Sequence, residues 1–105
     1  MTSPLFPGQF SPMVGSFQSI ALTNTAAVKL TLPTGTNGFP KYALVQALTN
    51  AVNWRDDGTA PTASVGGGMV LPISEDPSGF AGDLSAIQFI STSASGSTLL
   101  VSYYY

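Results

Sequence analysis

The side chains in this sequence that could carry acid–base chemistry are five carboxylates, namely Asp56, Asp57, Glu75, Asp76 and Asp83. Two carboxylates placed together can act as acid and base, as they do in glycosidases. Asp56 and Asp57, however, are neighbours in an Asp-Asp-Gly turn, where a carboxylate usually accepts a hydrogen bond from the backbone two residues further on. The Asp-x-Asp-x-Asp-Gly spacing of a calcium loop is absent. The carboxylates therefore favour a structural role in turns.

Histidine and cysteine are both absent from the sequence, which removes the commonest general base and the thiol nucleophile. A serine nucleophile would need Lys29 or Lys41 as its base, and neither lysine lies in a motif. The three glycines at 66–68 lack the Lys-Ser/Thr that follows in a phosphate-binding loop. We therefore expect no catalytic residue, no cofactor and no metal, and we predict that the protein is not an enzyme.

The sequence is unusually poor in charge. Charged residues make up 8% of the chain, against roughly 25% in an average soluble domain, and 13 Ser and 11 Thr supply the polarity instead. A net charge of −2 with three scattered cations argues against nucleic-acid binding, and no apolar run is long enough for a membrane-spanning helix. This composition suits a subunit packed into an assembly; the alternative is a monomer with a hydroxyl-rich surface. The start of the chain lacks a secretory signal, so we expect synthesis in a cytoplasm.

The elements that would position these residues are short strands separated by turns. Val28, Leu30 and Leu32 alternate with polar residues, which is the pattern of a half-buried strand. Residues 42–47 are apolar on both faces apart from one Gln, which indicates a central strand. About seven such strands follow one another at a spacing of roughly 8–12 residues, with no helical period. We predict one antiparallel β-sandwich, jelly-roll-like, over residues 17–105; a small β-barrel is the alternative.

The first 16 residues differ from the rest of the chain. Three prolines remove backbone donors and forbid helix, while the apolar content is higher than in a plain disordered tail. We interpret residues 1–16 as an extended arm that binds a partner protein; the alternative is a terminus whose apolar residues are incidental. The predicted contact residues of this arm are Leu5, Phe6, Phe10 and Met13.

Two further groups are candidates for contacts between copies of the chain. Trp54 and Arg55 belong to residue types that are enriched at interface anchors, although Arg55 could instead pair locally with the aspartates that follow it. The chain ends in Tyr103, Tyr104 and Tyr105. On a strand, Tyr104 points away from the other two tyrosines. The tyrosines on one face of the strand can pack in the core. Those on the other face would contact a partner protein, or a sugar stacked on the ring.

Several of these segments together resemble a known group of proteins. The run VNWRDDGTAPT at 52–62 follows the strand YALVQA at 42–47, and Gly-Met follows at 68–69. A strand at 84–90 and a final Ser-Tyr-Tyr at 102–104 complete the pattern. This combination resembles small virion proteins of tailed bacteriophages, over about residues 42–105. The proline-rich arm and the triple glycine lie outside the pattern.

The resemblance implies a structural component of the virus particle. Capsid cement or decoration proteins are the commonest role among small β-sandwich virion proteins, and they are often trimers at capsomer junctions. We therefore expect a homotrimer on the capsid surface that binds the major capsid protein and stabilises the head. The alternative is a receptor- or glycan-binding module of a head or tail fibre, which would present an exposed aromatic platform such as Trp54 or Tyr104. The resemblance implies no catalytic residues.

Overall fold

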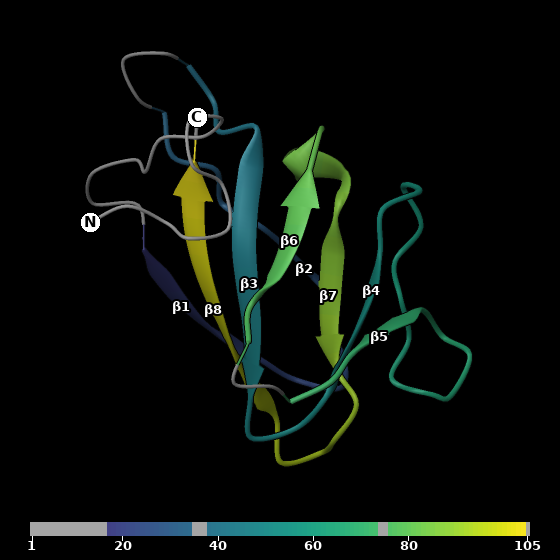
Figure 1. Ribbon diagram of the computed structural model, residues 1–105. Coiled ribbons are helices and arrows are strands. Elements are labelled where there is room, and N and C mark those ends of the chain that lie inside the picture. The colour runs from purple at the N-terminus through teal and green to yellow at the C-terminus, as the bar shows by residue number, and fades with distance from the viewer. Residues whose placement is uncertain (1–16, 35–37, 74–75, 105) are drawn as a thin grey trace.

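The computed structural model describes residues 17–34, 38–73 and 76–104, which form two four-stranded antiparallel sheets packed face to face (Figure 1). One sheet has the strand order β1-β8-β3-β6 and the other the order β2-β7-β4-β5. We call them the β3–β8 sheet and the β4–β7 sheet. This is the jelly-roll-like sandwich that the sequence predicts, and the alternative of a barrel is wrong because the strands remain in two separate sheets.

The bounds of the elements follow from the pairing of the strands. The β3–β8 sheet contains β1 (Gln18–Leu22), β8 (Ser97–Tyr104), β3 (Tyr42–Leu48) and β6 (Ser78–Ala81). The β4–β7 sheet contains β2 (Val28–Lys29), β7 (Gln88–Ser91), β4 (Val52–Arg55) and β5 (Met69–Leu71). A single 3-10 turn, η1 (Leu84–Ala86), precedes β7. In the described ranges no helix is long and apolar enough to cross a membrane.

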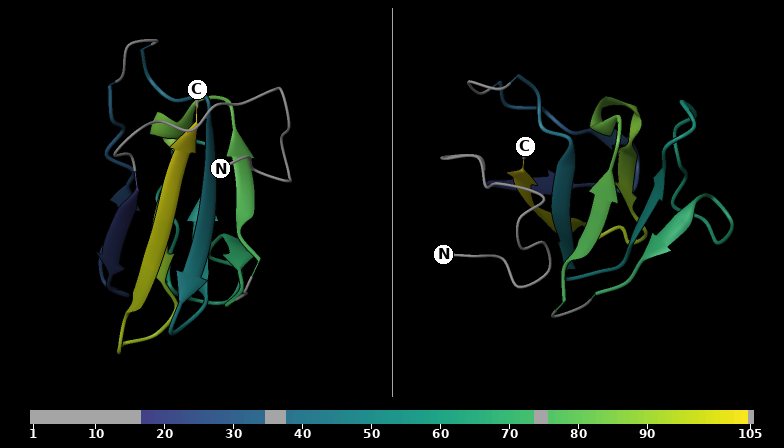
Figure 2. Two further views of the ribbon diagram at one scale, coloured as in Figure 1. Left: turned by 60° about the vertical axis from the view of Figure 1, so that its left-hand side comes forward. Right: turned by 45° about the horizontal axis from the view of Figure 1, so that its top comes forward.

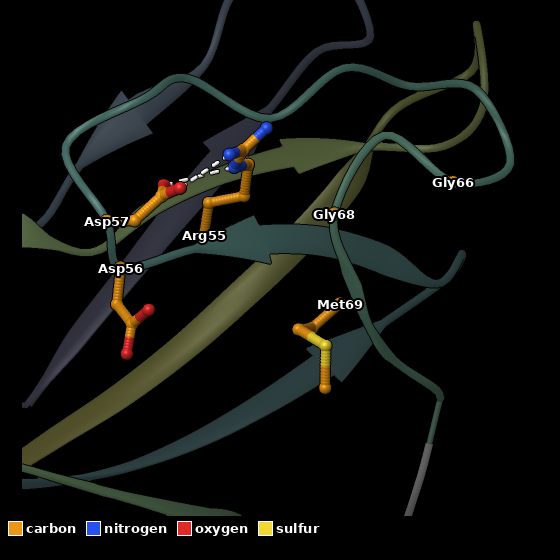
Figure 3. A pocket seen from close by; sticks show the side chains of 6 residues that line it. All are labelled: Arg55, Asp56, Asp57, Gly66, Gly68 and Met69. Atoms are coloured by element: carbon orange, nitrogen blue, oxygen red, sulfur yellow. Dashed lines mark hydrogen bonds and ion pairs between the residues drawn. The ribbon is translucent and has the colours of Figure 1, made fainter.

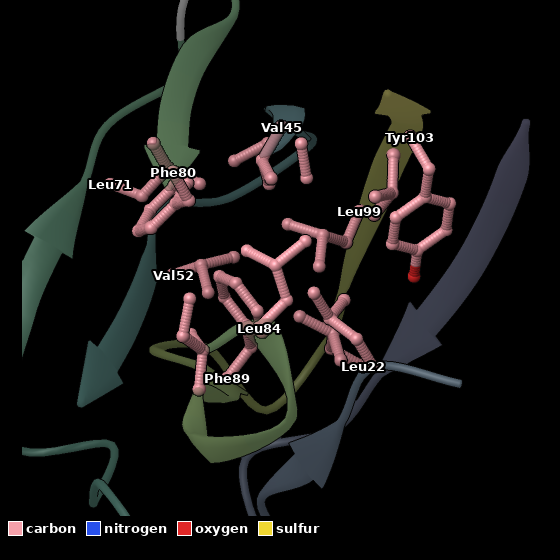
Figure 4. Close-up of a cluster of buried hydrophobic side chains, with 14 residues drawn as sticks. Leu22, Val45, Val52, Leu71, Phe80, Leu84, Phe89, Leu99 and Tyr103 are labelled. Carbon is pink, nitrogen blue, oxygen red and sulfur yellow. The ribbon is translucent and has the colours of Figure 1, made fainter. Parts of the chain in front are cut away.

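The sandwich core is formed by the inward faces of both sheets and by η1 (Figure 4). In β3, the alternate residues Ala43, Val45 and Ala47 are buried, and they pair in register with three buried residues of β8. Each large side chain that becomes fully buried contributes roughly 1.5–3 kcal/mol. Further large core residues, each at most 4% exposed, are Leu22, Val52, Leu71, Leu84, Ile87, Phe89, Leu99, Val101 and Tyr103.

The central position predicted for residues 42–47 is confirmed, because β3 lies between β8 and β6. Its outer face carries Tyr42, Leu44 and Leu48, so the strand is apolar on both sides. Tyr42 on this face is 7% exposed. Tyr42 also lies directly over Gly79 of β6, where a Cβ would come within 1.7 Å of the phenol oxygen. A residue without a side chain is therefore required beside this ring.

Two segments differ from the sequence prediction. Residues 75–79 read as a turn, but β6 begins at Ser78, because Phe80 is drawn into the core while its neighbours are small. Residues 84–90 read as one strand, but Leu84 and Ile87 both reach the core from η1 and its C-cap, three residues apart. The carboxylate of Asp83 caps η1 by accepting a hydrogen bond of 3.0 Å from the Ser85 amide. A hydrogen bond from the Ser85 hydroxyl, together with this bond from the amide, holds the pKa of Asp83 below its usual range.

Candidate functional site

The turn after β4 is locked by an ion pair between Arg55 and Asp57. Arg55 Nε donates to Asp57 Oδ1 at 3.0 Å, and its Nη2 donates to the other oxygen of the same carboxylate. Asp57 Oδ1 also accepts a longer hydrogen bond, of 3.3 Å, from the Thr59 amide. The guanidinium lowers the pKa of Asp57, and the carboxylate raises the pKa of Arg55. The local Arg–Asp pair considered from the sequence is therefore present, and it occupies the guanidinium of Arg55.

Asp56 has different surroundings from its neighbour. Its side chain points away from the Arg55–Asp57 pair (Figure 3). In the part of the chain that the structure describes, no hydrogen bond or ion pair reaches this carboxylate, and the residue is exposed. The two adjacent aspartates thus do not form a catalytic carboxylate pair: one is neutralised by Arg55 and the other faces solvent. Within the same described residues, no group of three potential metal ligands is present.

The loop between β4 and β5 is fixed against the outer face of the β4–β7 sheet by a buried asparagine. Asn53, 2% exposed, donates from Nδ2 to the carbonyl oxygens of Thr62 and Ser64 at 2.9 and 3.0 Å. Within the loop, the Thr62 amide donates to the Gly67 carbonyl and the Gly67 amide donates to the Ser64 carbonyl, both at 2.9 Å. These four hydrogen bonds hold the loop in one shape over β4.

Gly67 and Gly68 are required by close packing in this loop, and Gly66 by its positive φ of 83°. A Cβ on Gly67 would lie 2.0 Å from Thr62 Oγ1, and one on Gly68 would lie 2.8 Å from the Trp54 carbonyl oxygen. A depression of about 350 Å³ separates the loop from the turn after β4 (Figure 3). Its lining residues are Arg55, Asp56, Asp57, Gly66, Gly68 and Met69.

Exposed apolar side chains lie on β5 and in the segments directly before and after it, and Met69 among them also lines this depression. Six large hydrophobic residues are exposed in the described part of the chain, and four of them lie in this region. Met69 and Val70 are each 63% exposed, and Ile73 is 55% exposed. We call this group the β5 patch; its members are Val65, Met69, Val70 and Ile73. The sequence analysis missed the patch, although the apolar run MVLPI at 69–73 was its one signal.

The predicted anchor Trp54 lies at the margin of the core and is half-buried. Its ring packs edge-on against Phe80, with centroids 4.8 Å apart and an interplanar angle of 82°. Phe80 in turn packs edge-on against Phe89 at 5.9 Å. The Trp54 ring is therefore directed between the two sheets, and Arg55, the next residue, points to the opposite side of β4.

The terminal tyrosines point to opposite faces of β8, as predicted. Tyr103 is fully buried in the core, where its hydroxyl donates to Gln18 Oε1 at 2.9 Å and burial raises its pKa to about 12. Tyr104 lies on the outer face, 8% exposed, with its ring edge-on to Tyr42 at 6.0 Å. Tyr105 and the four predicted arm residues, Leu5, Phe6, Phe10 and Met13, lie outside the described residues.

A second depression lies at one end of the sandwich. It measures about 280 Å³, and its walls come from the segment before β3 and from the turn that leads into η1. Phe39 at its rim is 60% exposed. The lining residues are Leu32, Phe39, Pro40, Gly82, Asp83, Leu84 and Ser85. This depression is mostly apolar, and none of its lining residues belongs to the β5 patch.

Comparison of the chain with known protein families, with curated proteins and with solved structures gives no match in any of the three. The β5 patch with its adjoining depression is the surface of the described residues on which exposed apolar side chains and an unpaired carboxylate occur together. It is therefore the candidate functional site.

Proposed function

We propose that this protein is a capsid cement protein of a tailed bacteriophage, which binds the major capsid protein on the outside of the head and stabilises it. The observation that carries the proposal is the β5 patch, an exposed apolar surface on a small sandwich with very few charges. Exposed apolar surface that is gathered in one place is typical of protein–protein contact sites. The resemblance of residues 42–105 to small virion proteins supplies the class of partner.

The proposed mechanism is mechanical and needs no catalytic group. A protein bound across the seam between capsomers adds buried contact surface between them. Internal pressure must disrupt these additional contacts before the shell opens. Copies associated as a homotrimer would contact several capsid subunits at once, and linked contacts strengthen binding without any new kind of interaction. Under this proposal the protein works in the virion, on the capsid surface, and is not an enzyme.

Heat stability of shells tests the proposal. Purified capsids assembled without this protein are expected to form normally and to burst at a lower temperature than complete capsids. Adding the purified protein should raise the bursting temperature to that of complete capsids. Calorimetry or the release of packaged DNA on heating measures the effect. Equal heat stability with and without the protein would show that it does not act as cement.

The alternative of a glycan-binding fibre module depends on an exposed aromatic platform. Trp54 is half-buried and packs against Phe80, and Tyr104 is 8% exposed and packs against Tyr42, so neither ring is a widely exposed platform. The geometry therefore supports the cement proposal better. Copy number in the particle separates the two: cement is present in many copies and a fibre module in few.

A further inference from the structure

The free edge of β5 is unlike the other sheet edges of the molecule. β5 is the last strand of the β4–β7 sheet, and β4 is its one strand neighbour among the described residues (Figure 2). Met69 and Val70 point to opposite faces of the strand, yet both are 63% exposed. Edge strands are normally protected by charged residues, by proline or by shortness. β5 has no charged residue, but it is three residues long and is followed by Pro72, so its free backbone ladder is short.

The other three edge strands carry polar or small residues where they face solvent. β2 exposes Lys29, β1 exposes Ser19 and Ala21, and β6 exposes Gly79 and Ala81. Large apolar side chains are thus exposed on one edge strand in the described part of the chain. An exposed apolar edge is a template on which a strand of another chain can pair.

The charge beside this edge indicates what kind of chain would pair there. The depression at the Met69 end holds one cation and two carboxylates, and the guanidinium of Arg55 is taken up by Asp57. Asp56 therefore leaves the depression with an uncompensated negative charge. A partner that brings a lysine or arginine to this point would pair with it.

The surface is also already formed. Asn53 holds the 62–68 loop through the hydrogen bonds described above, and the Arg55–Asp57 pair fixes the turn on the other side of the depression. A partner would therefore not have to order these loops on binding, which is a cost that weakens association.

We propose that β5 accepts an extended segment of a partner protein as an added strand, with apolar side chains against Met69 and Val70 and a basic residue against Asp56. This inference rests on the proposed function in that both assume a protein partner. It goes further by assigning the surface and the chemistry of the segment: alternating apolar residues and one lysine or arginine at the end nearest the β4 turn.

A second copy of this chain fits the same edge less well. Antiparallel self-pairing centred on Val70 would bring Asp56 of one copy to the Ile73 end of the other. The cations of the chain are Arg55, which is already paired, Lys29 in β2 at the opposite edge of the sheet, and Lys41 at the start of β3. Self-pairing thus leaves Asp56 without a cation, whereas a basic segment of a different protein supplies one.

Peptide binding followed by NMR tests the inference. The probe is a capped hexapeptide of alternating valine and threonine that ends in lysine, and its counterpart ends in glutamate. The lysine peptide is expected to shift the amide resonances of Asp56 and of residues 69–71, and to bind more tightly than the glutamate peptide. D56N should weaken the lysine peptide about threefold, the effect of one exposed ion pair, and V70K should abolish binding.

A21K on the edge strand β1 is the matched control, since it adds the same charge to another exposed edge position and should bind the peptide like the wild type. Melting temperatures verify that all variants are folded. Shifts that map elsewhere, or equal binding by V70K, would overturn the inference. An oligomer of the wild type that V70K dissociates and A21K does not would also overturn it, because the occupant would then be a second copy.

Capsid shells separate this inference from the proposed function. If wild-type protein stabilises shells and V70K does so equally well, the function stands and the β5 inference is wrong. If wild-type protein does not stabilise shells but the lysine peptide binds at residues 69–71, the cement function is wrong and the β5 inference stands.

Discussion

At the scale of single residues, the neighbouring carboxylates Asp56 and Asp57 have different roles. Asp57 accepts hydrogen bonds from Arg55 and from the Thr59 amide, while no hydrogen bond or ion pair from a described residue reaches the carboxylate of Asp56. Reading the sequence treats the two as a pair in one turn, because adjacent residues share the same turn signal. In the structure the two carboxylates point in different directions, and Arg55 pairs with Asp57 alone.

Replacing Asp57 is expected to show a pH-dependent loss of stability. Its pKa is lowered in the folded protein, so the stabilisation is present above the ordinary carboxyl range near pH 4 and is lost as the pH falls through the lowered value. D57N should therefore have a slightly lower melting temperature than the wild type at pH 7 and the same melting temperature at about pH 2. D56N is the control and should match the wild type at both pH values. A difference that persists in acid would show that the ion pair is not its cause.

Tyr103 provides a spectroscopic test of the core. Its buried phenol has a pKa raised to about 12, so the neutral form stabilises the fold below the ordinary value near 10 and this contribution is lost as the pH rises between the two. Y103F should remove the latest step in an ultraviolet titration of the tyrosines. The variant should also lose about 1 kcal/mol through the hydrogen bond to Gln18. Q18L loses the same bond but keeps the phenol, so the late step should remain.

At the scale of elements, the loop that borders the β5 patch depends on one buried side chain. N53A leaves the carbonyl oxygens of Thr62 and Ser64 without their donor, which should cost about 1–3 kcal/mol. Hydrogen exchange should become faster at the amides of Thr62 and Gly67. N50A is the matched control, because the Asn50 amide bonds to the turn at residues 95–96 at the other loop. Unchanged exchange at Thr62 in N53A would show that the loop does not need this anchor.

The sequence predicts the strands best where the pattern of burial is regular. Residues 42–47 are recognisable because every position but one is apolar, as a central strand requires, and β3 does lie between the strands β8 and β6. β6 is not recognisable, because its residues Ser78, Gly79 and Ala81 are small and Phe80 alone reaches the core. The 3-10 turn at Leu84 is not predicted from the sequence. Its buried residues Leu84 and Ile87 are three positions apart, whereas a half-buried strand buries every second residue.

The candidate site is harder to predict than the fold. The run MVLPI at residues 69–73 indicates a short strand, and Pro72 within it suggests a sheet edge or a strand end, but apolar residues are usually buried. Whether they are covered depends on which strands become sheet edges, and that is decided by pairings between distant segments. β5 is an edge because β4 pairs on its other side with β7, from residues 88–91. The sequence therefore indicates the strand and its place at an edge, but not that Met69 and Val70 are exposed on both of its faces.

At the scale of the whole molecule, β8 holds the sandwich together. It pairs with β1, from the start of the described chain, and with β3, and it supplies the buried residues Leu99, Val101 and Tyr103. Their burial, at roughly 1.5–3 kcal/mol each, is comparable to the whole stability of a small domain, about 5–15 kcal/mol. A chain that ends after Gly96 is therefore expected to show no cooperative unfolding transition by circular dichroism. Cooperative melting of this truncated chain would mean that the sandwich is stable without β8, a central strand of the β3–β8 sheet.

Deletion of residues 1–16 is the complementary truncation and tests the predicted arm. All eight described strands lie between Gln18 and Tyr104, so the shortened chain is expected to melt cooperatively and to keep its β-type circular dichroism. If the arm and the β5 edge both contact the capsid, they act as two linked sites, and losing one should weaken binding to shells by at least about 100-fold. V70K should cause a comparable loss through the other site. Shell binding that survives the deletion unchanged would contradict the role of the arm and leave β5 as the contact.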